Sequence, residues 1–376
     1  MAGTILTLNA GSSSLKLGLF DASTPPRRLL SHTVARVGQE SGAHARALDE
    51  ALRLLDLHGG VKAVSAIGHR IVHGGPRFRS PQIVTSEVLA ELRRIEGLDP
   101  DHLPAEIAIV EAMRARAPSL PEVACFDTAF HYTMPRVARL LAIPRHYEAD
   151  GLQRYGFHGL SYTYLVQELA RVAGERAAGA RVVLAHLGSG ASLAAVQGGR
   201  CVDTTMSFTP NSGVPMGTRS GDIDPGVLLY LLRAGGLGTD QLDELLSKKS
   251  GLLGVSETSS DMRDLLEHRG SDPRAADAVA LFCHCVRKAV GAMAASLGGV
   301  DTLVFSGGIG ENAAPVRGEI ARGLEHLGIR LDDARNAASD AIVSSDASAC
   351  TVRVIRTDEE SVIARETLAT IADATR

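Results

Sequence analysis

The chain has 376 residues, of which 45% are hydrophobic and 22% charged, and its net charge at pH 7 is -4. A chain of this length and composition can bury a large core and is expected to form two or more domains. The slight negative charge and the short basic clusters, of which Pro25–Arg28 and Lys248–Lys249 are the longest, argue against a nucleic-acid partner.

The N-terminal residues MAGTILTLNAG lack the basic region and long apolar stretch of a signal peptide, and no run of about 18 apolar residues occurs in the chain. The sequence therefore predicts no membrane segment. The five cysteines are an odd number without regular spacing, which indicates free thiols in a reducing compartment. A cytoplasmic protein is expected.

Short β-rich runs alternate with long helical patterns along the chain, which predicts an α/β fold. The predicted strands are 5–8, 123–126, 181–186, 193–196, 302–305 and 352–355. The predicted helices are 104–115, 161–178, 224–234, 273–297 and 359–370, and the last of these carries acidic residues in its first turn, which suits the helix dipole.

The opening LTLNAGSSSLKLGLF is expected to form a hairpin, and it has a weak echo in VLAHLGSGASLAAV at 183–196. An echo at this separation indicates a duplicated domain, because the repeats of a solenoid are only about 20 to 50 residues long. We expect residues 1–150 and about 358–376 to form an N-terminal domain with the phosphate loop and acyl-substrate pocket. Residues 151–357 would form a C-terminal, nucleotide-binding domain.

Glycine-rich turns follow several predicted strands, and such turns let a backbone approach phosphate and ribose closely. In the first turn, Ser12 and Ser14 supply hydroxyls and Lys16 a positive charge, so the turn resembles a phosphate cradle although it is neither a Walker loop nor a dinucleotide motif. Three further glycine turns lie at 186–190, 217–222 and 306–312. Four such turns indicate a nucleotide held between two lobes.

Cationic and acidic residues complete the set. Arg70, His158 and Arg219 each lie beside glycines, and two arginines with a histidine around one cavity would suit an anionic acceptor and a phosphoryl group in transfer. Asp127 directly follows a predicted strand, and Glu359 lies at a strand-to-helix turn. Hard oxygen ligands at such positions commonly hold Mg²⁺ together with substrate phosphates.

Taken together and in order, the motifs resemble those of the acetate and propionate kinase family, within the actin-like ATPase superfamily. The resemblance covers nearly the whole chain and rests on NAGSSSLK, GHRIVHGG, FDTAFHYTMP, YGFHG, HLGSGAS, GTRSGDIDP, FSGGIGEN and DEESVIARET. It implies two duplicated actin-like ATPase (ribonuclease H-like) domains with the active site in the cleft between them. It also implies reversible phosphorylation of a short carboxylate by ATP with Mg²⁺, or with Mn²⁺ in its place, to an acyl phosphate and ADP, and a homodimer.

The resemblance also implies roles for individual residues. Asn9 and Glu359 would be associated with the metal, and Ser12, Ser14 and Lys16 with the phosphates. Asp127 would be the essential aspartate, and His158 and Arg219 would stabilise the transition state. The acceptor would meet Arg70 and an acyl pocket walled by Val72, Phe157 and Pro210. The nucleotide would contact His186, Leu187, Gly188, Ser189, Gly190, Asp261, Met262, Arg263, Gly307, Gly308, Ile309, Gly310, Glu311 and Asn312.

The chain departs from the family pattern at four positions. Ser189 replaces an asparagine, Tyr162 replaces a histidine and Asp358 adds an acid beside Glu359. The fourth is Asp101, which aligns with a pocket-wall leucine. An ionised aspartate in a dry pocket is strongly disfavoured, so either the alignment slips here or the pocket is wetter, and Asp101 could then select a polar or hydroxylated acid.

A carboxylate acceptor is already ionised at pH 7 and needs no general base. We therefore expect in-line transfer, with Arg70 on the acceptor, Arg219 and His158 on the equatorial oxygens, and Asp127 orienting Arg219 or a metal-bound water. One alternative is a kinase for propionate, butyrate or a hydroxy acid. Another is an actin-like or chaperone-like ATPase module. The cationic residues Arg70, His158 and Arg219 argue against this alternative, because such a module needs no site for an anionic acceptor.

Overall fold

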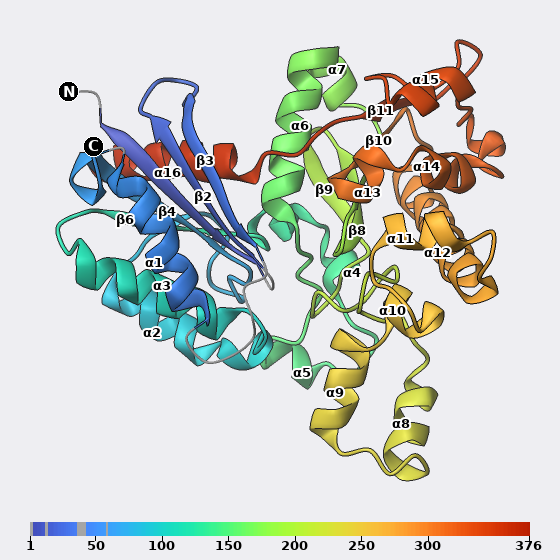
Figure 1. Cartoon of the computed structure of the whole chain (residues 1–376), viewed down its shortest axis with the longest axis horizontal. Helices are drawn as coiled ribbons and strands as arrows, with labels where there is room; N and C mark the ends of the chain where they lie inside the picture. Colours follow the sequence, from blue (N-terminus) through green and yellow to red (C-terminus); the bar gives the residue numbers. More distant parts are fainter. Residues whose placement is uncertain (1–2, 12–13, 36–42, 58) are drawn as a thin grey trace. The chain divides into compact units, whose positions relative to one another are not determined.

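The computed structural model describes residues 3–11, 14–35, 43–57 and 59–376. The chain divides into two compact units (Figure 1). Unit 1 comprises Met1–Tyr132, Phe157–Tyr164 and Asp358–Arg376, and unit 2 comprises Thr133–Gly156 and Leu165–Thr357. Residues 133–156 thus belong with the later part of the chain, before the expected division near residue 150. The functional assignment of the two domains stays a prediction.

Unit 1 is built on a six-stranded sheet with the order β3-β2-β1-β4-β6-β5. β1, β2 and β3 form an antiparallel meander, whereas β4 and β6 run parallel to β1. The short β5 closes the other edge, antiparallel to β6. The strands are β1 Thr4–Ala10, β2 Ser14–Asp21, β3 Arg28–Ala35, β4 Val64–Ile71, β5 Gln82–Ile83 and β6 Glu122–Phe126.

Helices cover both faces of this sheet, because alternate residues of its buried strands point to opposite sides. Leu6 and Leu8 of β1 belong to the apolar cluster that contains α1 (Ala43–Asp56) and α3 (Leu103–Arg116), whereas Ile5 packs with α16 (Glu359–Ala374). α2 (Ser86–Arg94) packs beside α3. In Figure 1, α16 lies along the blue strands, so the C-terminal end of the chain completes the N-terminal unit.

Unit 2 repeats this sheet with the order β11-β10-β7-β8-β9. β7, β8 and β9 form an antiparallel meander, and β10 and β11 run parallel to β7, as β4 and β6 run parallel to β1. The strands are β7 Val182–Leu187, β8 Ala191–Gln197, β9 Arg200–Thr204, β10 Thr302–Ser306 and β11 Thr351–Val354. The matching topology confirms the duplication that the two glycine-serine hairpins predicted.

The helices of unit 2 include the longest in the described chain, α12 (Pro273–Leu297). By length and composition α12 could cross a membrane, but its buried side chains pack against β8 and α10, as those of a core helix do. The other helices are α4 Arg136–Arg139, α5 His146–Ala149, α7 Glu175–Ala178, α8 Pro225–Arg233, α9 Thr239–Lys248, α10 Gly251–Ser256, α11 Met262–His268, α13 Gly307–Asn312, α14 Ala314–Ala321 and α15 Asp333–Ala338.

One predicted helix is divided in two. The pattern at 161–178 predicted a single helix, whereas α6 (Gly159–Ala173) ends before Gly174 and α7 follows. Gly174 has a φ of +85°, a left-handed value that glycine adopts without strain and that an α-helix excludes. The hydrophobic spacing continues through this break, so periodicity alone could not locate it. The helix predicted at 273–297 is confirmed with both of its ends.

Gly68 lets α16 lie close to the sheet of unit 1. A Cβ atom at this position of β4 would be 2.3 Å from the Thr367 hydroxyl oxygen and 2.6 Å from a methyl carbon of Ile363, both on α16. Such distances are shorter than any normal contact, so a side chain here would force the helix away from the strand.

We predict that Gly68→Ala destabilises the protein by about 1–3 kcal/mol, the usual cost of overpacking a core. A thermal melt of the variant beside Gly97→Ala would test this, because a Cβ at Gly97 meets no atom within 4 Å. Equal melting temperatures for the two variants would contradict the close approach of α16.

Candidate active site

A buried ion pair joins Arg70 to Asp127 at one end of the unit 1 sheet. Arg70 lies near the end of β4 and Asp127 follows β6, and because these strands are parallel neighbours their carboxyl ends meet at one edge. The Arg70 Nε and Nη2 atoms donate to Asp127 Oδ2 at 3.1 and 2.6 Å, and Nη1 donates to the Ala10 carbonyl oxygen at 2.9 Å. The Arg70 side chain is 12% exposed and that of Asp127 is fully buried.

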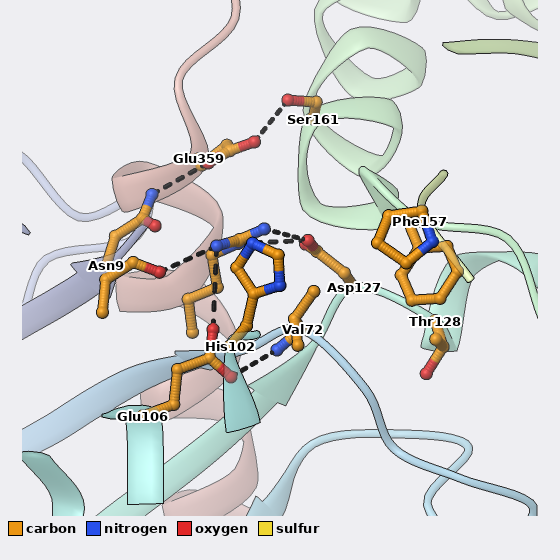
Figure 2. Close-up of polar contacts among 12 residues, drawn as sticks. Asn9, Val72, His102, Glu106, Asp127, Thr128, Phe157, Ser161 and Glu359 are labelled. Atoms are coloured by element: carbon orange, nitrogen blue, oxygen red, sulfur yellow. Dashed lines mark hydrogen bonds and ion pairs between the residues drawn. The ribbon is translucent and has the colours of Figure 1, made fainter. Parts of the chain in front are cut away.

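Glu106 brings a second carboxyl group to the same arginine. It lies in the first turn of α3, and its Oε2 accepts the backbone N–H of Val72 at 2.9 Å. Its Oε1 is 3.8 Å from Arg70 Nη1, which is too far for a hydrogen bond, and has no hydrogen-bond partner among the described residues. In Figure 2, Glu106, Val72 and His102 gather beside Asp127.

Asn9 and Glu359, the two residues predicted to be associated with the metal, lie side by side. Asn9 Nδ2 donates to Glu359 Oε2 at 2.8 Å and to Glu360 Oε1 at 3.2 Å. Ser161 at the start of α6 donates its hydroxyl to Glu359 Oε1 at 2.6 Å, as Figure 2 shows. Segments from the start, middle and end of the chain therefore hold one carboxylate in unit 1.

Lys16 reaches the same place because it lies directly opposite Asn9 in the antiparallel pair of β1 and β2. Its Nζ atom is 3.8 Å from Glu360 Oε1, and its side chain is 47% exposed. Ser14 begins β2, and its carbonyl oxygen accepts the Gly11 N–H and closes the turn. Ser12, the third residue predicted in this phosphate loop, lies outside the described residues.

Asp358, the additional acid beside Glu359, has a structural partner. It caps α16 by accepting the Ser361 N–H at 3.1 Å, and it forms an ion pair with Arg28. Arg28 also lies 3.6 Å from Glu360. This departure from the family pattern therefore caps the helix that carries Glu359.

His158 stands in a strained backbone conformation beside Asp127. Its φ is +60°, a value that few residues other than glycine adopt and that is often found at functional sites. The next residue, Gly159, donates its N–H to the Asp127 carbonyl oxygen, and a Cβ there would be 2.0 Å from that oxygen. The preceding Phe157 is buried, and its carbonyl oxygen accepts from His131 Nε2 at 2.8 Å.

Asp101, which aligns with a pocket-wall leucine, is exposed in the turn before α3. Its neighbour His102 contacts Asp99 through Nδ1 at 2.8 Å. From this segment it is Glu106, not predicted as a site residue, that approaches Arg70. A signal for it was present in the sequence, because Glu106 shares the apolar face formed by Leu103, Ile107 and Val110 at helical spacing.

In unit 2, the glycine turns predicted to contact the nucleotide lie against one another. Gly307 has a φ of +76°, and a Cβ there would be 2.6 Å from the Leu187 carbonyl oxygen. His186 pairs with Ser306 at the ends of β7 and β10, and the Gly217 N–H donates to the Ser189 carbonyl oxygen at 2.9 Å. The segments 186–190 and 307–312 are thus brought together at one edge of the sheet.

Internal hydrogen bonds hold α13, which contains the predicted residues Gly307, Gly308, Ile309, Gly310, Glu311 and Asn312. Glu311 Oε1 accepts the backbone N–H groups of Gly307 and Thr357. The fully buried Arg317, which was not predicted as a site residue, donates to the carbonyl oxygens of Gly310 and Glu311. A charged group buried beneath this turn fixes its backbone.

The remaining predicted residues of unit 2 lie on separate turns. Arg219 Nη1 donates to the carbonyl oxygen of the buried Pro210 at 3.1 Å. Asp261 caps α11 by accepting the Arg263 N–H and also forms an ion pair with the Arg263 side chain, whereas Met262 is buried. Ser189 is exposed on its turn.

Burial and charge act together on the ionisable groups around Arg70. Burial alone would lower the pKa of Arg70, but the carboxylates of Asp127, Glu359 and Glu106 raise it well above its ordinary value. Burial raises the pKa of Asp127, and Arg70 partly opposes this rise. Burial raises the pKa of Glu106 to about 8, although Arg70 and the Val72 N–H both act to lower it. Arg70 thus faces the closely paired Asp127 and, in Glu106, a carboxyl group that is largely neutral at pH 7.

Asn9 and Glu359 suit a hard divalent cation, because both offer side-chain oxygen atoms. No group of three or more histidine, cysteine, aspartate or glutamate residues forms a metal cage in the described ranges. A magnesium ion bound with substrate phosphates needs only one or two protein oxygens, the rest of its shell being water and phosphate. The donor set therefore fits such an ion.

We predict that Glu106 makes the folded state less stable as the pH rises. Its pKa is raised from 4.5 to about 8 on folding, so the folded chain binds more protons than the unfolded chain between these values. Its contribution is therefore full below pH 4.5 and falls, by at most about 1.4 kcal/mol per pH unit, as the pH rises through about 8.

Thermal melts of the wild type and Glu106→Gln at pH 5.5 and 8.5 would measure this effect, since glutamine cannot ionise. The wild type should lose stability relative to the variant at the higher pH. A difference in melting temperature that is the same at both pH values would show that Glu106 does not titrate in this range.

Comparisons with known proteins match the same family over nearly the whole chain. Residues 4–365 match the model of the Acetokinase family. An acetate kinase of Rhodopseudomonas palustris is 41% identical over 392 residues, covering 97% of this chain and 98% of the relative. A propionate kinase of Citrobacter rodentium is also 41% identical, covering 98% and 97%.

Two solved structures share the fold. The acetate kinase of Porphyromonas gingivalis matches with a TM-score of 0.88 at 36% identity, covering 98% of this chain and 100% of that one. A propionate kinase of Francisella tularensis matches with a TM-score of 0.90 at 35% identity, covering 98% and 99%. The predicted α/β fold with two related actin-like ATPase sheets is confirmed. The chain belongs to the acetokinase family.

Proposed function

We propose that this chain is an acetate kinase that transfers the γ-phosphoryl group of ATP to acetate, forming acetyl phosphate and ADP reversibly. The observation that carries this proposal is the Arg70–Asp127 ion pair, which lies in a chain of the acetokinase family and has an oxygen-rich cluster around Glu359 beside it. A module without an acceptor has no need of an arginine buried in this way, and the family membership sets that alternative aside.

Arg70 binds the acceptor carboxylate in this proposal. Three of its five N–H groups donate to Asp127 and Ala10, which leaves one on each terminal nitrogen for an acceptor. Asp127 holds the guanidinium of Arg70 in place within unit 1. Its expected role in orienting Arg219 or a metal-bound water stays a prediction. The acyl group lies against Val72 and Phe157, with Pro210 as a further wall and Asp101 outside the dry part of the pocket.

The phosphates are bound by Lys16 and the serines of its turn, Ser12 and Ser14. Asn9 and Glu359 hold Mg²⁺, or Mn²⁺ in its place, and such an ion neutralises charge on the phosphate oxygens when it is bound. Arg219 and His158 contact the equatorial oxygens of the transferring group. The nucleotide is bound by segments 186–190, 261–263 and 307–312 of unit 2.

Transfer to a carboxylate requires no proton abstraction, because the acceptor is ionised at neutral pH. A carboxylate oxygen attacks the γ-phosphorus in line, and the bond to the β-γ bridging oxygen breaks as ADP leaves. Positioning and charge neutralisation therefore supply the rate enhancement.

Propionate is the second candidate acceptor, since relatives named as propionate kinases match as well as those named as acetate kinases. The two acids differ by one methylene group, which a pocket distinguishes by only about 1–3 kcal/mol. We further propose a cytoplasmic homodimer, as the family resemblance implies.

Trapping of the acyl phosphate with hydroxylamine would test the proposal. Wild-type protein with ATP, Mg²⁺ and acetate should yield acetyl hydroxamate and an equal amount of ADP. A preparation that melts cooperatively, binds ATP and forms no hydroxamate from acetate or propionate would contradict the proposed activity.

We predict that Arg219→Ala lowers kcat by about 10³- to 10⁵-fold, as loss of an arginine finger does, with little change in ATP binding. Steady-state kinetics and nucleotide titration would separate the two effects. Arg176→Ala is a suitable control, because Arg176 is exposed on α7 of the same unit. A kcat within a few-fold of the wild-type value would remove Arg219 from the mechanism.

A further inference from the structure

In the carboxyl group of Glu106, one oxygen accepts a hydrogen bond and the other has no hydrogen-bond partner among the described residues. Oε2 accepts the Val72 N–H at 2.9 Å, which fixes the direction of the group. Oε1 has no hydrogen-bond partner in the described part of the chain, and the side chain is 2% exposed. Buried polar atoms in proteins nearly always have a partner, so an open one calls for an explanation.

The open oxygen faces the proposed acceptor site. It is 3.8 Å from Arg70 Nη1, one of the two terminal nitrogens that keep an N–H for the acceptor. Val72, whose N–H holds the other oxygen, is a predicted wall of the acyl pocket. An acid bound to Arg70 would therefore place the atoms next to its carboxylate within reach of Oε1.

A core-packing role does not account for Glu106. The apolar neighbours on its helix face, Leu103, Ile107 and Val110, are buried without polar atoms, and an aliphatic side chain would complete that face. An ion pair with Arg70 does not account for Glu106 either, because Arg70 already pairs with Asp127, with Nη2 and Oδ2 2.6 Å apart. A hydrogen-bonding group on a ligand bound at Arg70 would give Oε1 a partner.

Resting on the kinase activity proposed above, for which acetate is the simplest acceptor, we infer that Glu106 extends acceptor binding to short 2-hydroxy acids and favours them over acetate. The acid's carboxylate binds Arg70, and its hydroxyl group bonds to Glu106 Oε1. A hydroxyl both donates and accepts, so it can satisfy this oxygen whether the carboxyl group is neutral or ionised.

The surrounding charges are consistent with this role. Arg70, Asp99 and Asp127 act on the Glu106 carboxyl group, and the net effect of burial is to raise its pKa to about 8. A largely neutral carboxyl group at pH 7 does not repel the incoming carboxylate of the acceptor. The phosphoryl group still moves to a carboxylate oxygen with loss of ADP, and the hydroxyl group of the acid is unchanged.

Acetate and glycolate provide a direct test, because they differ only in a hydroxyl group on the carbon beside the carboxylate. We expect wild-type protein to have a higher kcat/KM for glycolate than for acetate in a coupled ADP assay. Glu106→Met should lower the glycolate-to-acetate ratio of kcat/KM at least about 10-fold, since a site that bonds a substrate hydroxyl discriminates strongly by it. Calorimetric titration of each acid should show the same change in binding.

Two further variants separate specificity from folding. Glu106→Gln keeps an acceptor for the Val72 N–H and an amide for the hydroxyl group, so it should retain most of the wild-type ratio. Glu122, at the start of β6, is another buried glutamate with one oxygen that lacks a hydrogen-bond partner among the described residues, and its other oxygen pairs with His69. Glu122→Gln should leave the glycolate-to-acetate ratio unchanged.

The outcomes distinguish this inference from the proposed function. Wild-type protein that phosphorylates acetate and not glycolate leaves the kinase activity standing and overturns the role of Glu106. A folded Glu106→Met variant with an unchanged ratio does the same and would mean that only water fills the gap. Turnover of neither acid overturns the proposed function and this inference together.

Discussion

The buried ion pair between Arg70 and Asp127 is the interaction on which the unit 1 site depends. Two parallel strands end side by side and place a guanidinium and a carboxylate 2.6 Å apart, nearly out of contact with solvent. Removing one partner of such a pair commonly costs about 3–5 kcal/mol, because the other charge is left buried alone. Proteins bury a charged pair at this cost in stability chiefly where one of the charges has a function. Here it keeps one arginine in a fixed orientation, with two N–H groups left for a ligand.

The duplicated sheet explains why the other chemistry-bearing residues lie where they do. In each unit an antiparallel hairpin precedes two parallel strands, so that a glycine turn and the ends of the parallel strands share one edge. In unit 1 this edge holds Asn9, Lys16 and Arg70, and α16 returns Glu359 to it from the end of the chain. In unit 2 the corresponding edge holds the turns at 186–190 and 307–312. Glycines stand where the backbones of these two turns come close to each other.

Patterns in the sequence predicted the strands, the longest helix and the glycine turns, because these depend on local spacing and on backbone freedom. They could not predict that Ser161 bonds to Glu359, since this contact joins segments far apart in the chain. The support that Arg317 gives to α13 is local in sequence, but it depends on how α14 packs against α13. Glu106 was missed for another reason: a carboxyl group on an apolar helix face was visible, but its nearness to Arg70 follows from how α3 packs on β4. The resemblance to a family aligned residues with roles, and it drew attention to Asp101, whereas the structure turns Asp101 to solvent.

The central claim, that Asp127 acts on the acceptor by holding Arg70, is tested most directly by a double-mutant cycle on KM for acetate. Arg70→Gln and Asp127→Asn are made singly and together, and the variants are checked for folding by thermal melts. The account predicts that Asp127→Asn raises KM in the wild-type background and adds almost nothing once Arg70 is replaced. If the fold-change in KM of the double variant equals the product of the fold-changes of the two single variants, Asp127 acts independently of Arg70. That result would contradict the account.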